Sequence, residues 1–311
     1  MALGSLFFMY TITLLGGWMM SKKNHSKSKK QTRQEKVDEA FELIEEGIQT
    51  IAASTKQYQN FLKFSSKHYQ YSLRNQVLIF QQMPNARFVA GFNTWKKHDR
   101  HVKKGEKGIK IIARGSKVKE VENENGEKEL QESYYYFVTH VFDISQTEGE
   151  DVPSFSDLIK TIKGETELYE KVKSVCSFPV YEKADSNGAD GYFDLKNKLI
   201  VIQRKNPSNH KLLTLIHEWG HGILHNDLEK RKELSRQQRE LEAESVGFTV
   251  CHVLGIDTSQ NSFGYLASFG QSKTIELIKQ SEERIQMAVK EILSKIDEEL
   301  QEDNEGYEVS A

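Results

Sequence analysis

Residues 212–221, Leu-Leu-Thr-Leu-Ile-His217-Glu218-Trp-Gly-His221, join an apolar helical face to two histidines and a glutamate. Residues four positions apart lie on one face of a helix, so the imidazoles of His217 and His221 can share one ion. Zn²⁺ suits two imidazoles and a carboxylate as protein ligands. Glu218 is offset from the histidine pair and can act as a general base on water. The stretch therefore predicts a helix that carries a hydrolytic zinc site.

The third ligand is predicted on the next helical stretch, near residues 232–254. There, residues 240–244 have the Glu-x-x-Ala-acid layout of glutamate-liganded zincins. In that layout Glu240 binds the metal, Ala243 lets the two helices approach, and Glu244 hydrogen-bonds a ligand histidine. Glu244 is the second choice as ligand and Glu242 the third.

The residues after His221 argue against a metzincin. A metzincin places its third ligand where Asp227 stands, but it needs a glycine at position 224, which is leucine here. His225 lies one helical turn past His221 and is expected to pack or hydrogen-bond rather than bind metal. A strand hairpin is predicted at 191–194 and 199–203, in front of this helix. It would offer an edge strand to an extended substrate.

A second feature is a basic segment in the N-terminal half. Between positions 96 and 119, ten residues are Lys or Arg, and only Asp99 and Glu106 oppose them. Aromatic residues flank the segment, with Trp95 before it and residues 134–137 after it. Lys and Arg contact phosphates, and exposed aromatic rings stack on unpaired bases. The segment suggests single-stranded nucleic-acid binding; a solvated basic loop beside an aromatic core is the alternative.

Three linked motifs resemble the N-terminal domain of ArdC-type antirestriction proteins, a single-stranded DNA-binding module. They lie at Tyr71–Ile79, Gly91–Trp95 and Val102–Ile109. The C-terminal half resembles the zincin domain of the same proteins and the ImmA/IrrE metallopeptidase-like group. The residues that carry this second resemblance are His217, Glu218, His221 and the run 240–244.

The resemblance implies a DNA-binding domain at 36–147 and a zinc-dependent metallopeptidase domain at 153–303. The DNA-contact residues predicted on this basis are Asn75, Trp95, Lys96, Lys97, Arg100, Lys103, Lys104, Lys107 and Lys110. It also implies a mobile-element protein that protects or processes incoming single-stranded DNA or its bound proteins. The alternative is a DNA-binding antirestriction protein whose zinc site is structural or inactive. The sequence does not indicate a peptide substrate.

Composition and patterning predict a soluble α+β protein. Of its 311 residues, 28% are charged and 37% hydrophobic, which favours folded over disordered. Cysteines occur only at 176 and 251, which argues against a disulfide scaffold. We expect an α+β N-terminal domain, then a mainly helical domain with a small antiparallel sheet. Helices are expected near 37–51, 58–82, 155–175, 209–225, 232–254 and 273–300, strands near 88–92, 109–113, 118–121, 134–142 and 178–182, and a tail at 304–311.

Residues 1–35 begin with 20 residues that carry no charge and continue as a basic tail. Three interpretations compete for residues 1–20. They suit a membrane anchor, which needs about 20 apolar residues, or a signal peptide, although the basic n-region is missing. Alternatively, translation starts at Met19 or Met20. The lysines that follow would keep the domains of an anchored protein in the cytoplasm, so a cytoplasmic location is expected, with a membrane-anchored form as the alternative.

Overall fold

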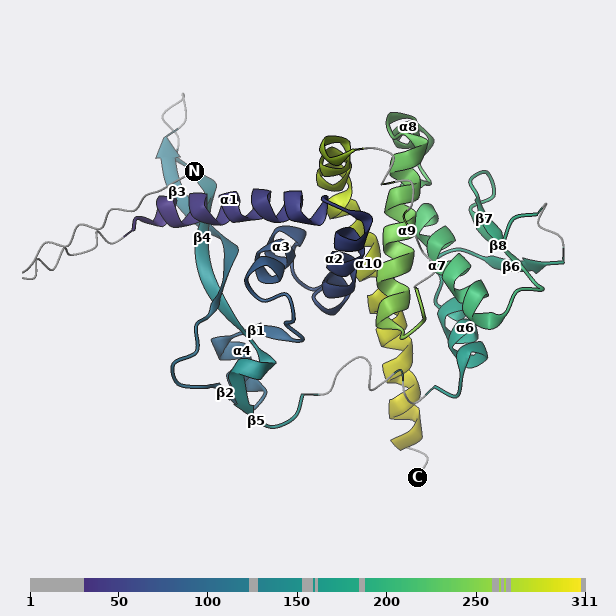
Figure 1. The fold of residues 1–311 in the computed structure, drawn as a ribbon, viewed down its shortest axis with the longest axis horizontal. Helices are drawn as coiled ribbons and strands as arrows, with labels where there is room; N and C mark the ends of the chain where they lie inside the picture. Colours follow the sequence, from purple (N-terminus) through teal and green to yellow (C-terminus); the bar gives the residue numbers. More distant parts are fainter. Residues whose placement is uncertain are drawn as a thin grey trace, which may run out of the picture. The chain divides into compact units, whose positions relative to one another are not determined.

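The computed structural model describes residues 31–122, 128–152, 159, 162–184, 188–258, 263, 266 and 270–308. Residues Arg33–Ala311 form one compact unit. Its elements make an α+β fold (Figure 1), as the sequence predicts. The segment 1–20, with its anchor and start-site interpretations, lies outside the described residues. Across the described part of the chain, no helix combines the length and the apolar composition that a bilayer crossing requires.

Three helices open the described chain: α1 (Arg33–Ile51), α2 (Thr55–Lys67) and α3 (Leu73–Gln82). The prediction of one helix across 58–82 is wrong, because a turn separates α2 from α3. Ser72 caps α3 by accepting the N–H of Asn75 on its hydroxyl at 3.4 Å. The amide of Gln76 donates to the carbonyls of His68 and Tyr71 at 3.0 and 2.9 Å. These polar contacts satisfy the backbone groups that the interruption would leave unpaired.

The β-structure of the N-terminal half forms a three-stranded sheet, ordered β1-β4-β3, and a β2-β5 pair. The elements are β1 (Val89–Gly91), α4 (Phe92–Lys97), β2 (Arg100–Val102), β3 (Ile109–Glu122), β4 (Lys128–Asp143), η1 (Ile144–Gln146) and β5 (Thr147–Gly149). The strands predicted at 109–113 and 118–121 are one continuous strand. It pairs with β4 from Ile109 opposite Val141 to Glu122 opposite Lys128.

The C-terminal half packs helices on a small sheet ordered β6-β8-β7. Its elements are α6 (Glu165–Ser174), β6 (Val180–Lys183), β7 (Gly191–Asp194), β8 (Leu199–Gln203), α7 (Ser208–His225), α8 (Leu228–Glu233), α9 (Arg236–Val253) and α10 (Gln271–Glu308). The sheet is mixed, because β6 runs parallel to β8 while β7 runs antiparallel to it. Strand β7 lies at an edge of this sheet, because β8 is the central strand.

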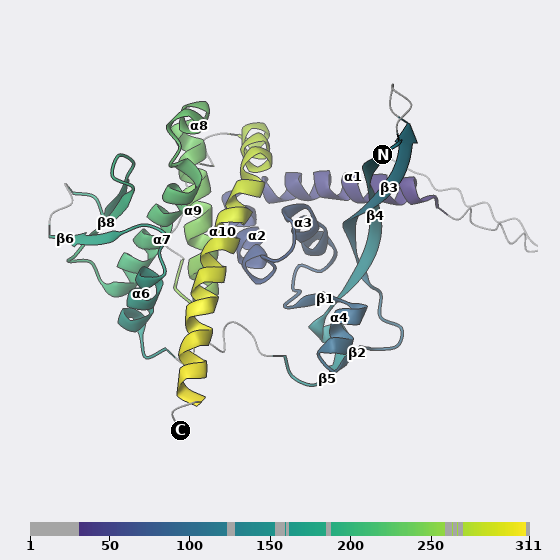
Figure 2. The same ribbon diagram turned by 180° about the vertical axis from the view of Figure 1, so that it is seen from behind.

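The long helix α10 contributes to two hydrophobic cores. Its Leu277 and Ile278 pack with the side chains of α1–α3, whereas residues from Ile285 to Leu300 pack with α7 and α9. Figure 2 shows α10 running along α9. The hydroxyl of Tyr58 on α2 lies 2.8 Å from that of Ser245 on α9, and both residues are buried. The N-terminal helices are thus packed directly on the helices of the C-terminal half.

Candidate metal centre

The close approach of α7 and α9 brings the predicted ligands together. A Cβ built at Gly220 of α7 would lie 3.3 Å from Val246 and 3.6 Å from the Cα of Ala243, both on α9. On the other helix, a Cβ built at Gly247 would lie 3.7 Å from the Cα of His217. Small residues at this crossing let two backbones meet where larger ones would hold them apart. The helices therefore cross beside the histidine pair.

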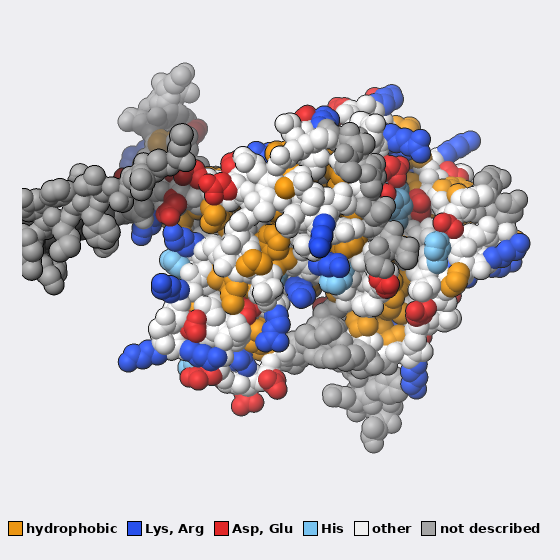
Figure 3. Space-filling model, viewed as in Figure 1, with side chains coloured by type: hydrophobic (Ala, Val, Ile, Leu, Met, Phe, Trp, Pro, Cys, Tyr) orange, Lys and Arg blue, Asp and Glu red, His pale blue; other side chains and the backbone are white. Residues whose placement is uncertain are grey.

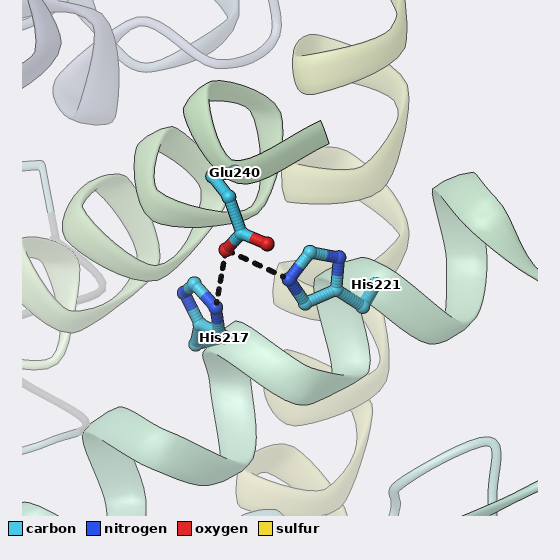
Figure 4. A group of neighbouring side chains, drawn as sticks. All are labelled: His217, His221 and Glu240. Carbon is cyan, nitrogen blue, oxygen red and sulfur yellow. Dashed lines mark ion pairs between the residues drawn. The ribbon is translucent and has the colours of Figure 1, made fainter. Parts of the chain in front are cut away.

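Three side chains converge at the crossing (Figure 4). Glu240 Oε2 lies 3.8 Å from Nε2 of His217 and 3.4 Å from Nε2 of His221. The potential ligand atoms of all three residues lie within 4.8 Å of one another. Zinc bonds of about 2.0–2.1 Å in a tetrahedron separate neighbouring ligand atoms by about 3.4 Å. The donor set and its spacing fit such an ion.

The protonation states also suit a cation. Burial lowers the pKa of His217 to about 4, so its ring is neutral at pH 7 and has a free lone pair. The contact with His221 holds the pKa of Glu240 at about 2, so this side chain is a carboxylate. Neutral imidazole and carboxylate are the forms that bind a divalent metal.

Glu218 lies on α7 beside the ligand pair but outside the converging group. Its Oε2 accepts the backbone N–H of Phe193, on edge strand β7, at 2.8 Å. Burial raises the pKa of the Glu218 carboxyl. A carboxylate with a raised pKa, fixed between the ligands and an edge strand, has the properties of a general base.

Behind His221 lies His225, which hydrogen-bonds as the sequence predicts. Its Nδ1 is 3.0 Å from Nδ1 of His221, and its Nε2 is 2.9 Å from Oε2 of Glu242. Glu242 is fully buried and points away from the ligand cluster. Glu244 is half-buried and lies outside that cluster. The contact with Nδ1 of His221 is made by His225. The spacing predicts this contact, since His225 stands one helical turn beyond His221.

Three of the residues predicted to contact DNA have structural roles instead. Trp95 is fully buried and donates its indole N–H to the carbonyl of Phe142 at 3.0 Å, so it offers no stacking surface. The amide of Asn75 donates to the carbonyl of Ile112 at 2.9 Å and accepts its N–H at 2.8 Å. This two-way contact anchors β3 to α3.

Arg100 is the third residue with a structural role. Only 7% of it is exposed, and its guanidinium donates to the hydroxyl of Thr147 at 2.8 Å and to the carbonyl of Gly149 at 3.0 Å. These bonds fasten β5 to β2. Because the guanidinium is buried and bonded to backbone and hydroxyl oxygens, it offers little surface to a phosphate.

The predicted lysines lie on α4, in the loop that follows β2 and at the start of β3. Lys96, Lys97, Lys103, Lys104 and Lys107 are exposed, and Lys110 is half-buried. Two of them contact their surroundings. Lys103 donates to the carbonyl of Ser145 at 3.0 Å, and Lys110 forms an ion pair with Glu39 at 3.3 Å. The structure keeps most of this charge on the surface, as the prediction requires.

A second basic surface, which the sequence did not reveal, lies between α2 and the end of α3. It is an open groove of about 660 Å³. We call it the α2–α3 groove. Its cations are Lys63, Lys67 and Arg87, all exposed, and none of its lining residues is acidic. Phe64 and Phe80 line its wall. Figure 3 shows a group of Lys and Arg side chains over α2 on this face. No sequence signal marks the groove, because Arg87 is distant in the chain from Lys63 and Lys67.

The proteins similar to the chain include two solved structures and one curated protein. A Bacillus anthracis protein described as uncharacterized is 27% identical over an alignment of 336 residues. The alignment includes 91% of this chain and 55% of that protein. The chain thus spans about half the length of this curated relative. The metal-free structure of the antirestriction ArdC protein from the R388 plasmid is 18% identical, with a TM-score of 0.46, and covers 73% of this chain and 86% of that one. The Mn(II)-bound structure is 17% identical, with a TM-score of 0.41 and coverages of 73% and 89%.

Two family models match separate parts of the chain. Residues 29–142 match the model described as the N-terminal domain of anti-restriction factor ArdC. Residues 180–254 match the model described as the IrrE N-terminal-like domain, and this range includes the whole ligand cluster and Glu218. The chain therefore carries an ArdC-type N-terminal domain followed by an IrrE-like domain.

Proposed function

We propose that the C-terminal half is a zinc-dependent metallopeptidase domain. The observation that carries this proposal is the convergence of His217, His221 and Glu240 at spacings that fit one tetrahedral ion. Glu218, held beside them by Phe193, adds the base that hydrolysis needs. A structural zinc site would not need such a buried carboxylate.

The chain's own residues support a hydrolytic mechanism. Bound by the three ligands, Zn²⁺ would supply Lewis acidity toward water and a peptide carbonyl. Glu218 takes the proton of the attacking water and then gives it to the leaving amine. The raised pKa of Glu218 makes it a stronger base toward water than an ordinary carboxylate. The edge strand β7 aligns an extended peptide by strand addition.

We also propose that the protein binds single-stranded DNA through its N-terminal half. The observation that carries this second function is the α2–α3 groove, which presents three exposed cations, the half-buried ring of Phe80 and no acid. Phosphates pair with such cations, and unpaired bases pack on aromatic rings. The exposed lysines at 96–107 extend the positive surface. The role we assign is protection or processing of incoming single-stranded DNA, or of proteins bound to it, in the cytoplasm.

The two functions are separable by variants. Glu218→Gln should retain zinc, abolish cleavage of a peptide library and leave DNA affinity unchanged. If Glu218→Gln still protects DNA from restriction in cells, the peptidase is dispensable for protection. Metal analysis of the purified full chain should find one zinc per chain; the sample is also tested with Mn²⁺, the ion in one of the R388 ArdC structures. Cleavage by Glu218→Gln at the wild-type rate would contradict the mechanism.

The DNA proposal is tested by removing the groove's charge. A variant with Lys63, Lys67 and Arg87 all changed to Ala should bind single-stranded DNA more weakly. Its dependence of log affinity on log salt should be shallower by about 2, since each phosphate contact on a single strand contributes about 0.7. The matched control changes three exposed lysines of the C-terminal half, Lys163, Lys196 and Lys205, to Ala. Equal losses in both variants would contradict a specific groove.

A further inference from the structure

A buried chain of hydrogen bonds runs from the ligand cluster into the core of the C-terminal half. It begins at Nδ1 of His221, 3.0 Å from Nδ1 of His225, and continues from Nε2 of His225 to Oε2 of Glu242 at 2.9 Å. The side chains of His225 and Glu242 are both fully buried. Burying two polar side chains costs free energy of desolvation, so their place next to a ligand residue points to a functional role.

Helix α10 anchors the far end of this chain. Ser281 donates its hydroxyl to Oε1 of Glu242 at 2.7 Å, and Arg284 donates to the same oxygen from Nε at 3.1 Å and also from Nη2. Donors therefore surround Glu242: a hydroxyl, a guanidinium and an imidazole. A carboxylate in this setting only accepts, and its orientation is fixed from two helices.

The donor and acceptor roles along the chain follow from that anchor. Because Glu242 accepts, Nε2 of His225 carries a hydrogen. A neutral imidazole has a single N–H, so Nδ1 of His225 is an acceptor and Nδ1 of His221 must donate to it. The remaining ring nitrogen of His221, Nε2, is then left with a lone pair. That nitrogen is the one 3.4 Å from Oε2 of Glu240.

We infer that His225 and Glu242 are positioning residues of the metal centre, which fix the ring orientation and the tautomer of His221 so that Nε2 is free to bind a cation. The inference rests on the proposed zinc site and deepens it. The opposite tautomer of His221 would place a hydrogen on Nε2, between the ring and the ion. It would also bring the lone pairs of two Nδ1 atoms together at 3.0 Å. The pair thus prepares the ligand before the metal arrives, as hydrogen-bond partners of metal ligands do.

The first test needs no variant. Long-range ¹H–¹⁵N spectra of the metal-free full chain report which ring nitrogen of each histidine carries hydrogen. We expect His221 to be protonated on Nδ1 and His225 on Nε2. His221 protonated on Nε2 instead would overturn the inference. Because this measurement is made without metal, it stays decisive even if the wild-type chain proves to bind no zinc, a result that would overturn the proposed function alone.

The second test measures zinc affinity by competition with a chelator. His225→Phe and Glu242→Gln should each weaken binding by about 10- to 100-fold, the usual cost of losing a partner of a metal ligand. Val250→Ala, which removes buried contacts from α9 without touching the hydrogen-bond chain, is the matched control and should keep wild-type affinity. Folding of each variant is checked by circular dichroism before titration. Affinities of folded His225→Phe within threefold of wild type would overturn the inference.

Discussion

Phe193 donates its backbone N–H to Oε2 of Glu218 at 2.8 Å, which ties the edge strand β7 to the helix that carries His217 and His221. The carboxylate and the strand that would align a peptide are therefore held at a fixed distance from each other. A peptide added to β7 would arrive with its backbone already set against the base. Positioning of this kind is a large part of what an active site contributes.

The contact between β7 and α7 depends on Gly191. A Cβ at this position would lie 2.6 Å from Cγ2 of Thr214 and 2.7 Å from the carbonyl oxygen of Val201. Gly191→Ala should push β7 away from α7, destabilise the protein by about 1–3 kcal/mol and reduce peptide cleavage. Urea denaturation and a cleavage assay measure the two effects. Lys196→Ala, in the exposed turn after β7, is the control; a Gly191→Ala variant as stable and as active as wild type would refute the argument.

The low pKa of His217 predicts how the stability of the metal-free protein depends on pH. Burial lowers this pKa from 6.5 to about 4, so between these values the unfolded chain binds a proton that the folded chain does not. Stability should therefore be complete above about pH 6.5 and fall as pH drops toward 4. Burial also lowers the pKa values of the buried His68 and the half-buried His252. These two residues therefore also make the folded protein less stable as the pH falls. The urea midpoint should depend less steeply on pH in His217→Asn than in the wild type. An unchanged dependence on pH would contradict the role assigned to His217.

Tyr58 and Ser245 offer a test of the packing between the two halves. Ser245 donates its hydroxyl to the carbonyl of Leu241 at 2.6 Å, so Tyr58 must be the donor in the 2.8 Å contact with Ser245. Tyr58→Phe removes this bond and keeps the ring, and should lower the free energy of unfolding by about 1 kcal/mol. Tyr181→Phe, on an exposed tyrosine, should change it by less than about 0.5 kcal/mol. Equal effects would show that the buried bond contributes nothing.

Variants of Arg100 and Lys97 should distinguish residues of the basic segment that stabilise the fold from residues that bind DNA. Arg100→Ala leaves Thr147 and the end of β5 without their donor, so it should cost about 2 kcal/mol or more of stability. Lys97→Ala removes an exposed charge and should leave stability within about 0.5 kcal/mol of wild type. Thermal unfolding and DNA titrations at several salt concentrations measure both. A stable Arg100→Ala variant with weakened DNA binding would reverse this assignment.

Local periodicity carried the prediction of the ligand cluster. His217 and His221 are one helical turn apart, and the pattern around Glu240 belongs to a single helix, so each part of the cluster has a short-range signal. The approach of Glu240 to the histidines depends on the crossing of α7 and α9. The same patterns predicted the β7–β8 hairpin and the helices α1, α7 and α10. Sequence could not separate α2 from α3, because apolar spacing continues through the turn that Ser72 and Gln76 stabilise.

Tertiary packing decided what the sequence could not. Trp95 and Arg100 have the composition of a nucleic-acid surface, yet the fold buries both. The α2–α3 groove escaped prediction because Lys67 and Arg87 meet only after α2 and α3 have packed together. The partner of His225 was equally hidden, since Glu242 lies on a different helix and was predicted only as a lower-ranked ligand.

Helix α10 has a consequence for the order of events during synthesis. It supplies Leu277 and Ile278 to one core and Ile292 and Leu293 to the other, and its Gln286 accepts the N–H of Leu73 at the start of α3. A ribosome releases these residues only after every other described element has emerged. Neither core is complete before then, so the faces that α10 covers remain exposed on the nascent chain. Exposed faces of this kind are what chaperones bind.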